Sequence, residues 1–121
     1  MIKRVSKVKV RENFGHLAMP ASDRDLIENF LRAVCEWAPT SLKSIILYGS
    51  IAKGIFPEEY DVDILLLFSS DFDHPRLYSD VYRTIRTLEP HREMHVVLKW
   101  EVEIEPAYWE LIEEEGIPLY P

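Results

Sequence analysis

The stretch YDVDILLLF (residues 60–68) and the run before it, SIILYGS (residues 44–50), decide the fold. Both are almost continuously apolar, which favours two strands buried in a sheet. Asp61 and Asp63 interrupt the second run. Because side chains alternate along a strand, these carboxylates share one face, with their α-carbons about 6–7 Å apart. Two carboxylates on one face of an otherwise apolar strand are costly unless a cation compensates their charge.

Helical patterns flank the two strands. Ser22 and Asp25 resemble a capping box at the start of an apolar periodicity that ends before Pro39. Pro75 opens a second such pattern, which Pro90 terminates. The expected order is helix 23–37, strand 44–50, strand 60–68, helix 75–89, strand 92–102 and helix 106–115. This order predicts an α/β (α+β) domain with a small mixed sheet flanked by helices.

Length and composition fit one globular domain. The chain has 121 residues, of which 47% are hydrophobic and 29% charged, so disordered and fibrous classes are excluded. Cys35 is the sole cysteine; it lies on the apolar side of the first predicted helix, and we expect a packed core thiol. No apolar run reaches the roughly 20 residues of a membrane span, and the first residues lack a signal-peptide pattern. We therefore expect a soluble, cytoplasmic protein with no membrane partner.

Charge is distributed unevenly. The net charge is −7, yet residues 1–11 carry five bases and no acid, which leaves −12 for residues 12–121. The acidic body should repel nucleic-acid backbones, so direct nucleic-acid binding is not expected. We divide the chain into residues 1–22, a basic arm or edge strand, and residues 23–121, the folded domain.

The loop before the acidic strand, GSIAKG (residues 49–54), suits a phosphate. Gly49 lets backbone approach a ligand closely, Ser50 offers a hydroxyl, and a helical turn from Ile51 would direct free N–H groups at an anion. Lys53 could add a point charge for a triphosphate. Mg²⁺ favours one or two carboxylates plus substrate phosphates. The candidate nucleotide-binding residues are Gly49, Ser50, Lys53 and Gly54, and the candidate metal ligands are Asp61 and Asp63.

The Asp-x-Asp pattern alone is weak, because it occurs twice more in the chain. We assign structural roles to Asp23 and Asp25, in the first turn of a helix, and to Asp71 and Asp73, in a polar loop. Only the pair at 61 and 63 interrupts a buried strand and follows a Gly-Ser loop. The combination is therefore more informative than either part.

Gly49-Ser50, residues 51–60 and Asp61-Val62-Asp63 resemble the signature of the minimal nucleotidyltransferases, the smallest members of the DNA polymerase beta superfamily. The resemblance extends from about residue 23 to Ile117-Pro118-Leu119-Tyr120. It implies a palm-like nucleotidyltransferase fold over residues 23–121 and Mg²⁺-dependent transfer of a nucleotide monophosphate to a hydroxyl. It also implies pairing with a HEPN-domain toxin, for which such a protein is the antitoxin that adds AMP from ATP to a tyrosine.

One position departs from that family. The third carboxylate, which helps hold the metal and draws the proton from the attacking hydroxyl, corresponds here to His95. Imidazole can accept a proton near neutral pH, whereas Mg²⁺ prefers oxygen ligands. Glu93 shares the strand face of His95 and could supply the oxygen. His95 as catalytic base, Glu93 as metal ligand and His95 as a structural residue in a weakened site all remain open.

Two main functions follow. The first is an active nucleotidyltransferase with Asp61, Asp63 and His95 as catalytic residues and Asp61, Asp63 and Glu93 as metal ligands. The alternative is a catalytically weak or inactive antitoxin of the same fold that acts as a binding module. A structural metal site without nucleotide leaves the Gly-Ser loop unexplained. The remaining aromatics could form a partner surface, although we expect core packing: Tyr78, Tyr82, Trp100, Tyr108 and Trp109.

Overall fold

The computed structural model describes residues 19–37, 41–54, 60–70 and 75–120, apart from the side chain of residue 113. The predicted basic arm and the pair at positions 71 and 73 lie outside these residues. The α+β fold is confirmed. The elements, in chain order, are α3 (Ala21–Trp37), β1 (Leu42–Tyr48), β2 (Val62–Phe68), α4 (Leu77–Leu88), β3 (Met94–Trp100), a 3₁₀ turn (Glu101–Glu103), α5 (Pro106–Glu115) and β4 (Ile117–Tyr120).

The four described strands form one mixed sheet in the order β3-β2-β1-β4. β1 runs antiparallel to both of its neighbours, and β2 pairs with β3 in parallel. The register places Tyr48, Asp63 and His95 side by side in one row across the sheet. The row is the frame on which the site is built.

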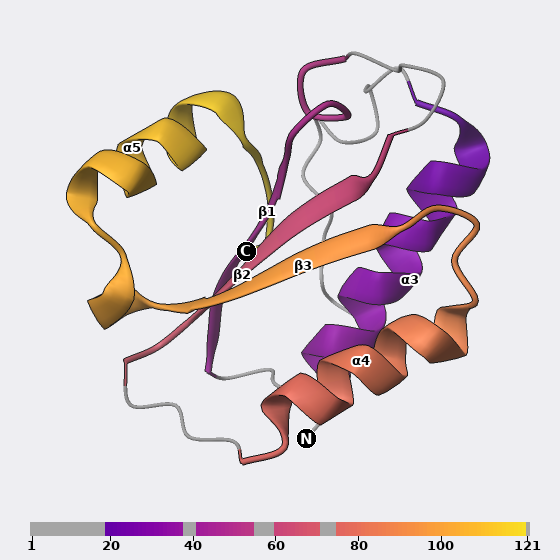
Figure 1. The fold of residues 1–121 in the computed structure, drawn as a ribbon, viewed down its shortest axis with the longest axis horizontal. Helices are drawn as coiled ribbons and strands as arrows, with labels where there is room; N and C mark the ends of the chain where they lie inside the picture. Colours follow the sequence, from indigo (N-terminus) through magenta and orange to yellow (C-terminus); the bar gives the residue numbers. More distant parts are fainter. Residues whose placement is uncertain (1–18, 38–40, 55–59, 71–74, 121) are drawn as a thin grey trace.

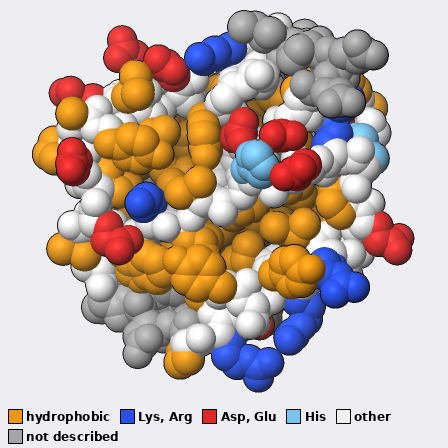
Figure 2. Space-filling model, in the orientation of Figure 1, with side chains coloured by type: hydrophobic (Ala, Val, Ile, Leu, Met, Phe, Trp, Pro, Cys, Tyr) orange, Lys and Arg blue, Asp and Glu red, His pale blue; other side chains and the backbone are white. Residues whose placement is uncertain are grey.

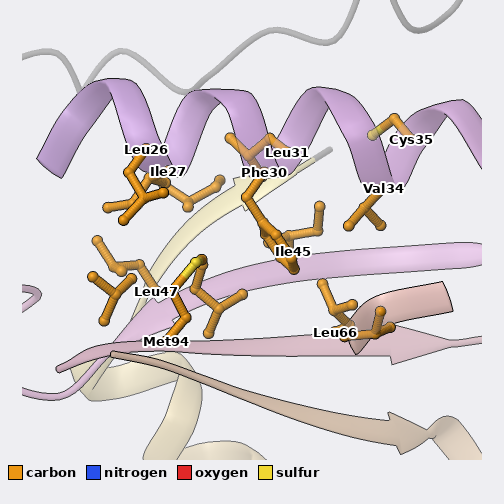
Figure 3. Close-up of a cluster of buried hydrophobic side chains, with 14 of the residues drawn as sticks. Leu26, Ile27, Phe30, Leu31, Val34, Cys35, Ile45, Leu47, Leu66 and Met94 are labelled. Carbon is orange, nitrogen blue, oxygen red and sulfur yellow. The ribbon is translucent and has the colours of Figure 1, made fainter. Parts of the chain in front are cut away.

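The two faces of the sheet are covered differently. α3 and α4 lie on one side of the strands and α5 on the other (Figure 1). The larger core lies between the sheet and α3, whose apolar side chains point at the strands (Figure 3). The second face holds a smaller cluster of Ile46, Leu65 and Ile112. Much of that second face is therefore left to the site and its surroundings.

α3 shows why the helical pattern succeeded and where it failed. Its apolar residues at helical spacing are buried, and Cys35 is fully buried among them, as expected. Burial raises the pKa of the Cys35 thiol to about 11, so the thiol is inert at neutral pH. The predicted capping box is wrong, because the helix starts at Ala21 and the N–H groups of Asp23 and Arg24 donate to the Pro20 carbonyl.

Several boundaries differ from the sequence predictions. β2 starts at Val62, so Asp61 precedes the strand, and β3 ends at Trp100, where a 3₁₀ turn replaces its predicted end. β4 was not predicted, since its four residues include Pro118; it pairs antiparallel with β1. The expected core packing of Tyr78 and Tyr82 is wrong, as they are 70% and 63% exposed on α4.

Trp100 and Trp109 are half-buried, each beside one of the two core clusters, while Tyr108 is 37% exposed. Within the described residues, no helix has the length and apolarity needed to cross a membrane.

Candidate functional site

Three carboxylates gather at one end of β2 and β3. Asp61 directly precedes β2, Asp63 is the second residue of β2, and Glu93 directly precedes β3. The side chains of Asp61 and Asp63 are 43% and 23% exposed, so they lie at the accessible end of the strand and not within its buried part as the sequence suggested. A backbone hydrogen bond from Val62 N to the Glu93 carbonyl, 2.9 Å, holds the two strand entrances together.

His95 lies at the centre of these acids, directly beside Asp63 in the parallel register. Its Nδ1 is 3.5 Å from Asp61 Oδ2 and 3.4 Å from Asp63 Oδ1. Its Nε2 lies 2.8 Å from Glu93 Oε2. Figure 2 shows a histidine among acidic side chains on this face of the molecule. The imidazole thus bridges the carboxylates of both strands.

Electrostatics in this cluster favour positive charge. The pKa of His95 is raised, above all by its hydrogen bond with Glu93 and also by the charges of Asp61 and Asp63. The pKa of Asp63 is raised by burial and by the charge of Asp61, against the opposing influence of His95. Even a protonated His95 cannot balance three carboxylates. The cluster therefore keeps a net negative charge, which a bound cation would compensate.

The loop after β1 packs directly on these acids. Gly49 has φ +78°, and a Cβ at this position would overlap Asp63 Oδ2. The glycine is therefore required twice, for its left-handed backbone and for the close approach of the carboxylate. Lys53 N donates to the carbonyls of Gly49 and Ser50, which closes a single helix-like turn where the sequence predicted a helical turn from Ile51.

The other residues of the loop are placed around this turn. Ser50 follows Gly49 at the start of the turn, and Gly54 ends it with φ +74°. Lys53 Nζ lies 3.6 Å from Glu115 of α5, and both side chains are half-exposed. The ammonium group that was predicted to bind a triphosphate therefore pairs with Glu115. To bind a triphosphate, Lys53 would have to leave this ion pair.

A second charged cluster supports the two strand entrances from the helical side. Asp23 of α3 is fully buried, and Tyr60 donates a hydrogen bond to its carboxylate. His91 Nε2 lies 2.5 Å from Asp23 Oδ1, and Arg92 Nε donates to both oxygens at 3.0 and 3.2 Å. The Arg92 guanidinium also lies 3.8 Å from the centre of the Tyr60 ring.

This second cluster holds the residues that come directly before two of the candidate ligands. Tyr60 precedes Asp61, and Arg92 precedes Glu93. The structural role predicted for Asp23 rested on the helix dipole, and none of its three partners was predicted from the sequence. No local sequence pattern links Asp23 with His91 and Arg92, which lie 68 and 69 residues away. The only signal in the sequence was that charged residues lie near the ends of predicted elements.

The donor set fits a hard divalent ion. One ligand atom from each of Asp61, Glu93 and His95 lies within 4.8 Å of the others, and Asp63 contacts the same imidazole. Mg²⁺ prefers the carboxylate oxygens of this set, with substrate phosphates completing its shell. Asp61 and Glu93, two of the three metal ligands that the sequence proposed, belong to this group, whereas the third, Asp63, is joined to it through His95.

Residues 27–119 match the family model of the nucleotidyltransferase domain. A succinyl-diaminopimelate desuccinylase of Stenotrophomonas maltophilia is 30% identical over 116 residues, which cover 85% of this chain and 30% of that protein. A protein of Methanocaldococcus jannaschii named "putative protein adenylyltransferase" is 38% identical over 53 residues, 44% of this chain and 53% of the relative. The chain thus spans about a third and about half of the lengths of these relatives.

The crystal structure of a protein described as a "putative nucleotidyltransferase" from Sulfolobus solfataricus aligns with a TM-score of 0.43 at 18% identity, covering 84% of this chain and 89% of that one. The family model covers most of the chain, from α3 through β4, and includes the Gly-Ser loop and all the acids of the cluster. The chain therefore belongs to the nucleotidyltransferase domain family.

Proposed function

We propose that this protein is a Mg²⁺-dependent nucleotidyltransferase that moves AMP from ATP onto a hydroxyl of a partner protein. The observation that carries the proposal is the cluster of Asp61, Asp63 and Glu93 around His95, directly beside the Gly49 turn. A bound Mg²⁺ would neutralise phosphate charge and orient the triphosphate. Asp61, Asp63 and Glu93 are the residues that would hold it.

The chain's own groups have distinct roles in the transfer. The acceptor oxygen forms a bond to the α-phosphorus of ATP, the bond to the β-phosphate oxygen breaks, and pyrophosphate leaves with its electron pair. The Gly49-Ser50 turn binds the phosphates through N–H groups and the Ser50 hydroxyl, with Lys53 and Gly54 at its end. His95 in its neutral form accepts the proton of the attacking hydroxyl, since it is the one imidazole among the described acids of this cluster.

The biological setting that we propose is a toxin-antitoxin pair. A HEPN-domain toxin is the acceptor, and the protein acts as its antitoxin in the cytoplasm. This proposal rests on the resemblance to minimal nucleotidyltransferases and is supported by the similarity to a relative that is named as a protein adenylyltransferase. The acidic composition of the chain, with net charge −7, also favours a protein over a nucleic-acid acceptor.

A second function is favoured by the geometry of His95. Its two nitrogens already contact all three carboxylates, so the imidazolium takes the part of a cation there. A protein whose acids are compensated in this way could neutralise its partner by binding alone. The alternative is a catalytically weak or inactive antitoxin of the nucleotidyltransferase fold.

One experiment separates the two. The intact mass of the partner, encoded beside this gene, is measured after co-expression with the native chain, with an Asp61→Asn, Asp63→Asn variant and with the matched surface variant Asp25→Asn. An AMP-sized increment with native protein and Asp25→Asn, but not with the double variant, supports the enzyme. Neutralisation by all three without any increment supports the binding module and overturns the transferase.

Binding of nucleotide is measured separately by titration calorimetry. ATP should bind with Mg²⁺ and fail to bind without it, because the carboxylates repel bare phosphates. Equal affinity under both conditions would overturn the metal assignment. Ser50→Ala should weaken binding without loss of fold.

A further inference from the structure

We propose that the acceptor is an extended polypeptide segment that lies on the open face of β3, in the groove beside α5, and carries an apolar side chain two residues from the modified hydroxyl. This inference rests on the proposed function and adds where the acceptor binds and what sequence it carries. Two observations support it: Val97 and Lys99 share a strand face with His95, and a groove lies beside these residues.

His95, Val97 and Lys99 alternate along one face of β3. The opposite residues, Met94 and Leu98, belong to the core beneath α3, whereas Val97 packs with the smaller cluster on the other face. The site and the open face of the strand are therefore continuous. Positions two apart on one strand face are separated by about 7 Å, the same spacing as in an extended peptide laid along it.

A groove begins where this face leaves the site. It has a volume of about 480 Å³ and is lined by Val97, Lys99, Glu103, Ile104, Glu105 and Tyr108. A neighbouring hollow of about 550 Å³ shares Ile104 and reaches Leu67 and Trp109. Figure 2 shows hydrophobic side chains spread over this face beside the acidic cluster. The groove therefore offers apolar contacts along β3, starting at Val97, two residues beyond His95.

The position of the groove assigns it to the acceptor and not to the nucleotide. The Gly49 turn follows β1, whereas the groove lies along β3, and β2 with Asp63 separates the two strands. Phosphates held at the turn place the nucleotide on the β1 side of the acids. The attacking hydroxyl then approaches from the β3 side, over His95.

The chemistry of the lining selects a polypeptide. Two glutamates, Glu103 and Glu105, stand against the single cation Lys99, so the phosphates of an RNA acceptor would be repelled. Val97, Ile104 and the ring of Tyr108 instead suit an apolar side chain. With the acceptor hydroxyl over His95, the side chain that meets Val97 belongs to the residue two positions away.

The test uses synthetic peptides with one tyrosine in an alanine and lysine background and a single leucine placed one or two positions to either side. Transfer of AMP from ATP is followed with Mg²⁺ present. The peptide with leucine two positions from tyrosine, on one side, should have a KM about tenfold below that of the peptides with leucine at the adjacent positions, the usual effect of burying one apolar side chain.

Protein variants locate the effect. Val97→Ser and Tyr108→Ala should each raise the KM of the preferred peptide several-fold to about tenfold while leaving kcat and the affinity for Mg²⁺ and ATP unchanged. The control is Tyr82→Ala, which removes an exposed aromatic ring from α4, outside the groove. Far-ultraviolet circular dichroism verifies that each variant is folded.

The outcomes separate this inference from the proposed function. Failure of ATP to bind with Mg²⁺ would overturn both. Binding of ATP without modification of any peptide, equal KM for all leucine positions, or a KM that responds to Tyr82→Ala as strongly as to Tyr108→Ala would each overturn the groove alone.

Discussion

Two clusters of carboxylate and histidine lie on either side of the same strand entrances, and they are opposites in charge balance. Asp23 is one fully buried carboxylate with three donors, Tyr60, His91 and Arg92. Around His95, three carboxylates that are all partly exposed share a single imidazole. The first cluster is satisfied by the chain itself, and the second is not.

The pKa directions follow from this difference. Burial raises the pKa of Asp23, but hydrogen bonds from Tyr60, His91 and Arg92 outweigh it and the net pKa is lowered. The pKa of Asp63 is raised instead, by burial and by the charge of Asp61. The fold therefore stabilises the Asp23 carboxylate as an anion, whereas it holds the Asp63 carboxylate at a cost, which is typical of an acid at a ligand site.

Removing the charge of Asp23 should have the largest effect on stability. Asp23→Asn leaves Arg92 and His91 facing an uncharged amide in a buried site, so the free energy of unfolding should fall by about 3 kcal/mol. Urea denaturation measures it. The matched control is Asp25→Asn, an exposed residue one half-turn along the same helix, which should change stability by less than about 0.5 kcal/mol. Similar small losses in both variants would show that the buried cluster contributes little.

The same cluster should govern acid unfolding. Since the pKa of Asp23 is lowered in the folded state, its contribution is fully present above the unfolded value of about 3.9 and is lost as pH falls through the folded value. The native chain should therefore lose stability more steeply than Asp23→Asn as the pH falls below about 5. Denaturation midpoints at a series of pH values measure the two slopes. Parallel slopes would remove Asp23 from the acid response.

Most helices and strands could be predicted from the sequence, because each is encoded by a pattern of apolar residues within its own segment. Apolar spacing located α3 and α4, continuous apolar runs located β1 and β2, and α5 has the predicted bounds. β4 was missed, since a four-residue strand with a proline carries no periodicity. Tyr78 and Tyr82 were misjudged because a helix stripe does not reveal which side meets the sheet.

The site was legible only in part. Asp61, Asp63, Glu93 and His95 were proposed together, and the parallel register of β2 and β3 brings them into contact. The packing of Gly49 on Asp63 and the pairing of Lys53 with Glu115 were not foreseen, because both join residues from separate elements. Contacts between distant elements depend on strand order, which no single segment encodes.

Substitutions at Gly49 and Gly54 can distinguish the cost of backbone strain from the cost of a clash with the site. Gly49 and Gly54 both have positive φ, but an added Cβ meets Asp63 only at Gly49 and open space at Gly54. Gly54→Ala should lower the free energy of unfolding by about 1 kcal/mol through backbone strain alone. Gly49→Ala should lower it by about 2–3 kcal/mol, because it also displaces the carboxylate. Equal losses by urea denaturation would contradict the close packing of the loop on the acids.

Neutralising Asp63 should have the smallest effect, with the opposite sign. The raised pKa means that the folded chain holds this charge at a cost near neutral pH, with Asp61 repelling it and His95 offsetting part of the repulsion. Asp63→Asn should therefore raise the free energy of unfolding by less than about 1 kcal/mol in the absence of divalent ions. Saturating MgCl₂ should then stabilise the native chain and leave the variant unchanged, because an ion that binds only the folded state adds its binding free energy to stability. Asp25→Asn serves again as the control and should respond to MgCl₂ as the native chain does. A loss of stability in Asp63→Asn like that expected for Asp23→Asn, with no response of the native chain to MgCl₂, would make the accessible cluster structural and remove the metal from the proposed mechanism.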